Sequence, residues 1–176
     1  APDPGLKHVA AASALDQAVR SGAPFATSLA AVKGFASADA LKPLEPFAAS
    51  GVPDAASLLR ELSTLLPRLE PKQAEVPSSS GVIDRLQHSA MKLVRIRRVD
   101  TGGDDVAAVV ARTKAAIARD DISAARRELS ALSPAARAPV QPWLDKLAAR
   151  DAALAASQKF VADTVAALPA SATSRQ

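Results

Sequence analysis

The fold class is decided by residues 140–168, VQPWLDKLAARDAALAASQKFVADTVAAL, near the end of the chain. Positions at alternating spacings of four and three residues are apolar there, except at Asp151 and Gln158, and this spacing places them on one side of an α-helix. The pattern predicts a long last helix with a candidate helix-pairing seam, because coiled coils present the same stripe to their partners. Whether the seam is internal core or an interface between two copies is left open. Its members are Leu144, Leu147, Leu154, Val161, Val165 and Leu168.

Composition extends the helical expectation to the whole chain. Of the 176 residues, 48% are apolar but only 3% are aromatic, and alanine is the commonest residue. Alanine is the best helix former and contributes little to a sheet. We therefore expect an all-α protein of helical hairpins or a small bundle, with tetratricopeptide-like helix pairs. The 34-residue period of a tetratricopeptide array is not repeated, so a long array is not expected.

Prolines and glycines suggest the domain organisation. Gly22 and Pro24 separate two predicted helices near the start, and Pro67 limits a later leucine-rich helix. The stretch RLEPKQAEVPSSSG that follows is rich in proline and serine, which is typical of an exposed connector. The expected organisation is an N-terminal helical bundle at 1–67, a linker at 68–81 and a C-terminal helical region at 82–176.

A basic run, KLVRIRRV at 92–99, interrupts the alanine-rich pattern. Its residues alternate with the period of an extended strand, so it predicts a short extended segment. In one interpretation its apolar side covers the bundle and its arginines stay in water. In another it is a positive patch that meets anionic lipid headgroups or an acidic partner. Nucleic acid is disfavoured, since no aromatic residue lies nearby to stack on bases. The expected contact residues are Lys92, Arg95, Arg97 and Arg98.

No arrangement of residues predicts catalysis, a cofactor or a metal ion. The chain has no cysteine, which excludes disulfides and thiolate sites. His8 and His88 lack a second ligand at metal-binding spacing and are expected at the surface. The acidic pairs at 104–105 and 120–121 precede predicted helices, where capping explains them. No phosphate-binding glycine loop or serine-nucleophile motif is present.

These residues show neither the pattern of a membrane-spanning helix nor that of a signal peptide. No window of 18 residues is continuously apolar, and the first residues lack the charged and apolar regions of a signal peptide. The absence of an initiator methionine fits a fragment whose targeting segment lies upstream.

Three stretches, in order, carry a family resemblance. They are GAPFATSLAAVKG at 22–34, LKPLEPFAASGVPDAASLLREL at 41–62, and the long stretch from GVIDRLQHSAMKLVRIRRVD to ALSPAARAPVQPWLDKLAAR at 81–150. Together they resemble the C-terminal part of the alphaproteobacterial mitofilin family, bacterial relatives of the mitochondrial protein that shapes crista junctions. A second resemblance, through LVRIRR, is to a membrane-anchored protein encoded beside haem-biosynthesis enzymes.

The mitofilin resemblance implies a non-enzymatic domain that organises and tethers membranes. The implied parent protein has an N-terminal inner-membrane helix and a coiled coil, which place this domain on the periplasmic side of the bacterial inner membrane. The implied partners are the anionic membrane surface and outer-membrane assembly proteins, with no cofactor, and a homo-oligomer is left open. The competing hypothesis is a soluble helical interaction module that binds a peptide or partner helix without lipid.

Overall fold

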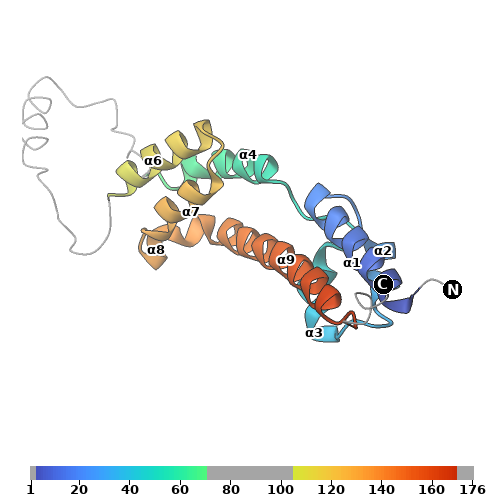
Figure 1. Ribbon diagram of the computed structural model, residues 1–176. Helices are drawn as coiled ribbons and strands as arrows, with labels where there is room; N and C mark the ends of the chain where they lie inside the picture. Colours follow the sequence, from blue (N-terminus) through green and yellow to red (C-terminus); the bar gives the residue numbers. More distant parts are fainter. Residues whose placement is uncertain (1–2, 71–104, 170–176) are drawn as a thin grey trace, which may run out of the picture. The chain divides into compact units, whose positions relative to one another are not determined.

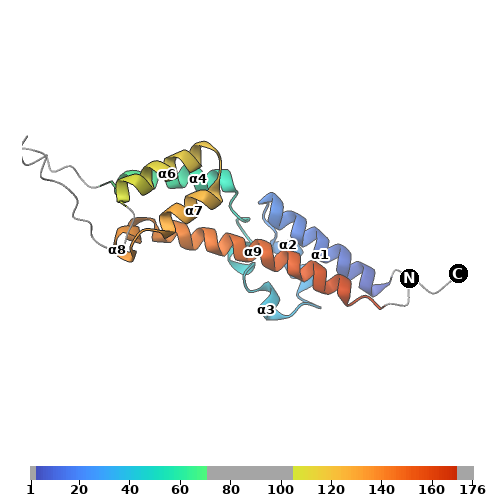
Figure 2. The same ribbon diagram turned by 60° about the vertical axis from the view of Figure 1, so that its left-hand side comes forward.

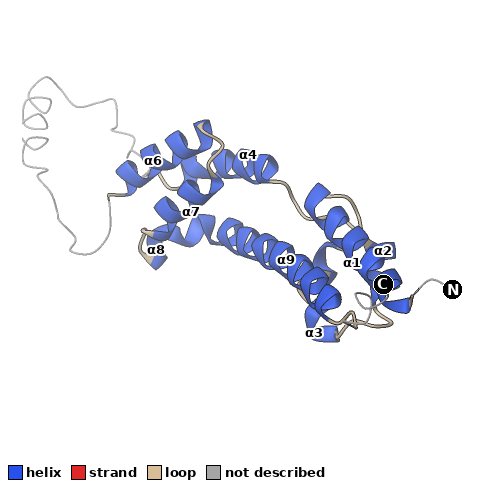
Figure 3. Cartoon of the chain, viewed as in Figure 1, coloured by secondary structure: helices blue, strands red, loops and turns tan. Residues whose placement is uncertain are grey.

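The computed structural model describes residues 3–70 and 105–169. All regular secondary structure in these two ranges is helical, and no strand occurs in them (Figure 3). This confirms the prediction of an all-α fold. The chain divides into two compact units, one formed by residues 1–61 with 142–176 and the other by residues 62–141.

The first unit opens with α1 (Pro4–Ser21), where the side chain of Asp3 accepts a hydrogen bond from the backbone N–H of Gly5 (2.8 Å). Gly22 ends the helix in the left-handed conformation, with φ of 71°, that suits glycine after a helix. Three short elements follow. They are α2 (Ala26–Val32), α3 (Ala38–Leu41) and the 3-10 turn η1 (Glu45–Phe47).

The leucine-rich helix ends as Pro67 predicts. Helix α4 (Ala55–Leu65) is followed by a 3-10 turn, η2 (Leu66–Arg68), with the proline inside the turn. Leu66, the first residue of this turn, is buried and lies four residues after the buried Leu62, whereas Leu65 is half-buried.

The long last helix is also confirmed, as α9 (Gln141–Ala166). In Figures 1 and 2, α1 and the last turns of α9 lie side by side. Two contacts give their antiparallel direction. Gly5 lies close to Leu168, and further along α1 the Asp16 carboxylate accepts a hydrogen bond from the Ser157 hydroxyl (2.7 Å).

The core of the first unit is built from both ends of the sequence. Leu29 and Val32 of α2 are buried in it, and two side chains of α9 complete it. Its members are Ala12, Leu15, Val19, Phe25, Leu29, Val32, Leu41, Leu44, Val52, Ala153 and Phe160.

The second unit contains a helix pair, α6 (Val106–Ala118) and α7 (Ile122–Ser130), joined by a short turn (Figure 1). Asp120 occupies the turn with a positive φ of 54°, and the side chain of Asp121 caps α7 by accepting from the N–H of Ala124 (2.8 Å). The pair fits the predicted tetratricopeptide-like hairpin. The remaining elements are α8 (Pro134–Arg137) and η3 (Ala138–Val140).

The expected domain bounds stay a prediction. The two observed units are interleaved in sequence, whereas the prediction has contiguous domains at 1–67 and 82–176. Most of the expected linker at 68–81 and all of the expected extended segment at 92–99 lie outside the described residues.

Candidate functional site

The four basic residues expected at a lipid or partner contact lie outside the described residues, so their role stays a prediction. They are Lys92, Arg95, Arg97 and Arg98.

The predicted seam lies on α9 and just past its end. Leu147 is buried, Val165 is 46% exposed and the other four members are half-buried. Leu154 and Val161 pack against the core of the first unit. Pairing of the seam with another copy stays a prediction. The most buried side of α9 is rotated slightly from the seam and consists of Trp143, Leu147, Ala153, Ser157 and Phe160.

A buried polar contact joins α1 to α9. Asp16 is only 6% exposed, forms an ion pair with Arg20, and accepts a hydrogen bond from the Ser157 hydroxyl (2.7 Å). Burial of a charged group is unfavourable unless it is paired and hydrogen-bonded, so this contact favours one register of the two helices. Sliding α9 by one turn would separate Ser157 from the carboxylate.

An earlier stretch of α9 is bound to α4 and to the residues just before α4. The indole N–H of Trp143 donates to the Leu58 carbonyl (2.7 Å), and the guanidinium Nε of Arg150 donates to the Pro53 carbonyl (3.0 Å). Lys146 contacts both carboxylate oxygens of Glu61 at 2.7 and 2.8 Å. Spacings of three and four residues put these three side chains on one side of α9. The sequence shows the spacing of these three residues, but it does not predict their hydrogen-bonding partners.

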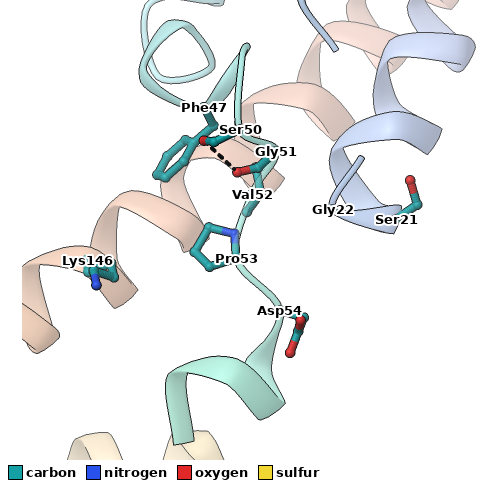
Figure 4. Close-up of a pocket in the computed structure, with 9 residues that line it drawn as sticks. All are labelled: Ser21, Gly22, Phe47, Ser50, Gly51, Val52, Pro53, Asp54 and Lys146. Atoms are coloured by element: carbon teal, nitrogen blue, oxygen red, sulfur yellow. Dashed lines mark hydrogen bonds between the residues drawn. The ribbon is translucent and has the colours of Figure 1, made fainter. Parts of the chain in front are cut away.

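A hollow of about 480 Å³ lies beside these contacts (Figure 4). Its apolar wall includes Phe47, Val52 and Pro53, and its charged groups are Asp54 and Lys146. Ser57 donates to Asp54 from its backbone N–H (2.7 Å) and from its hydroxyl (2.9 Å). These bonds hold the pKa of Asp54 below its ordinary value of 3.8. Asp54 is therefore a helix-capping anion at neutral pH, and Lys146 is already bonded to Glu61. The lining residues are Ser21, Gly22, Phe47, Ser50, Gly51, Val52, Pro53, Asp54 and Lys146.

Two loops of the first unit meet at this hollow. The N–H of Phe25 donates to the Ala48 carbonyl (2.9 Å), and Gly51, with φ of 81°, is packed against the backbone of Gly22. A Cβ added at Gly51 would lie 2.7 Å from the carbonyl carbon of Gly22. Close approach of two backbones therefore requires glycine at this position.

Charged side chains of the second unit form ion pairs along the helix pair. Arg112 of α6 bonds Glu128 of α7 at 2.6 Å, and Lys114 bonds Glu70 at 2.7 Å. The capping role predicted for the acidic pairs is confirmed at Asp105, which accepts from the N–H of Ala107 (3.3 Å).

The described residues show no metal centre. Within 3–70 and 105–169, no group of three or more histidine, aspartate or glutamate side chains is placed to hold an ion. His8, expected at the surface, is partly exposed, and its ring stacks on Phe35 with centroids 3.9 Å apart. Among the helices that are described, none has the length and apolarity needed to cross a bilayer.

Comparison with known proteins finds similarity over most of the chain. The MICOS complex subunit MIC60 of Phaeosphaeria nodorum is 32% identical over 128 residues, which are 69% of this chain and 20% of that protein. Over this stretch the chain is mitofilin-like. MIC60 of Pyrenophora tritici-repentis is 32% identical over 130 residues, covering 70% of this chain and 20% of the relative. The chain thus spans about a fifth of the length of the curated relatives it matches.

No family model matches the mitofilin-like chain, and no solved structure matches it. The similarity to MIC60 agrees with the resemblance found in the sequence. The alphaproteobacterial branch of that resemblance stays a prediction.

Proposed function

We propose that this chain is a non-enzymatic, membrane-organising domain of mitofilin type. The observation that carries the proposal is the similarity to MIC60 over 69% of the chain, since MIC60 is named as a subunit of a complex. A protein that acts by assembly needs helical surfaces and charged contacts in place of a reactive site. The buried polar contact between α1 and α9 and the α4 contacts of α9 supply rigid helical surfaces of that kind.

The proposed location is the periplasmic side of a bacterial inner membrane, with an upstream segment as the anchor. There the domain would contact the anionic membrane surface and outer-membrane assembly proteins. This location follows from the alphaproteobacterial resemblance, and the match to MIC60 supports it only at the level of a mitofilin-like protein.

The proposed membrane contact is the basic run, through Lys92, Arg95, Arg97 and Arg98. A basic side chain near an anionic membrane contributes on the order of 1 kcal/mol of binding, so four together are sufficient for measurable association. The attraction is Coulombic and should weaken as salt is raised.

Co-sedimentation with vesicles tests this contact. The chain should pellet with vesicles that contain anionic phosphatidylserine, less so at high salt, and poorly with purely zwitterionic vesicles. Reversal of Arg95, Arg97 and Arg98 to glutamate should abolish pelleting. The control is reversal of Lys7, Lys33 and Lys42, three exposed lysines of the first unit, which makes the same change in net charge.

Two results would contradict the proposal. If the Arg95/Arg97/Arg98 variant pellets as well as the parent chain, the basic run is structural. If the parent chain captures a partner protein equally with and without vesicles and never pellets with lipid, the soluble interaction module is the better hypothesis.

A further inference from the structure

We draw no further inference here: the strongest candidate, the apolar surface patch at the paired ends of α1 and α9, where Leu6 is 59% and Val165 is 46% exposed, carries none because nothing in the structure shows what covers it.

Discussion

Single polar side chains favour one register between the helices of the first unit, because alanine-rich surfaces carry few shape features of their own. Trp143 is 1% exposed and hydrogen-bonded to the Leu58 carbonyl, 85 residues away in sequence. Local capping could be predicted from sequence, as at Asp105 and Asp121. The partners of Trp143 and Asp16 could not, since their contacts depend on how distant helices pack.

The Trp143 hydrogen bond should be measurable. We expect Trp143→Phe to lower the free energy of unfolding by about 1–3 kcal/mol, because it removes the indole donor and leaves space where the larger ring was. Urea denaturation measures the change. Lys146→Gln on the same side of α9 breaks a partly exposed ion pair and should cost less than about 1 kcal/mol. Equal stability of the parent and Trp143→Phe would show that the indole contributes nothing.

Asp54 predicts a pH dependence of stability. Its pKa is lowered in the folded chain by the bonds from Ser57, so its contribution is present above the unfolded pKa and is lost as pH falls through the folded value. The midpoint of thermal unfolding should therefore differ most between the parent and Asp54→Asn near neutral pH, and the difference should shrink in acid. A difference that stays constant between about pH 6 and pH 2 would contradict this assignment.

At the scale of elements, helix starts and stops follow the sequence closely, whereas the exact phase of a helix face does not. Proline and glycine positions predicted the ends of α1 and α4. Both Leu65 and Leu66 fit the helical spacing from Leu62, and tertiary packing decides that Leu66 is the one that is buried. The close approach of the Gly22 and Gly51 backbones could likewise not be predicted, because each glycine alone predicts only an ordinary turn.

Substitution of Gly51 should show how strongly that approach constrains the loops. Gly51→Ala should lower stability by about 2–5 kcal/mol, since its φ of 81° disfavours a side chain and the new Cβ would collide with Gly22. Gly34→Ala is the matched control, because a Cβ there would have no neighbour within 4 Å. Thermal unfolding compares the two. Similar melting temperatures would mean that the loops can move apart without loss.

At the scale of the whole molecule, the sequence predicts an all-α chain correctly but gives no sign that the first unit is discontinuous. Apolar periodicity reports which side of a helix is buried without identifying what covers it. The seam on α9 illustrates this, since Leu154 and Val161 pack on the core of the chain's own first unit. Of the candidate contacts, the basic run could be proposed from charge alone.

Two substitutions separate the core and interface roles of the seam. Val161→Asp should cost about 2–4 kcal/mol of unfolding free energy, because it places a charge against the core. Val165→Asp, at a residue that is 46% exposed, should change stability by less than about 0.5 kcal/mol. Light scattering then reports the solution mass. A lower mass for Val165→Asp than for the parent would show that the seam joins two copies.

Because α1 packs against α9, the first unit cannot complete its fold until α9 has been synthesised. Asp16 and Ser157 are separated by 141 residues, so at about 5–20 residues per second the ribosome needs roughly 7 to 30 s to deliver the second after the first. During that interval α9 is not yet available to complete the core around Leu15 and Val19. The nascent chain is therefore expected to engage chaperones through its first helix until α9 has been synthesised.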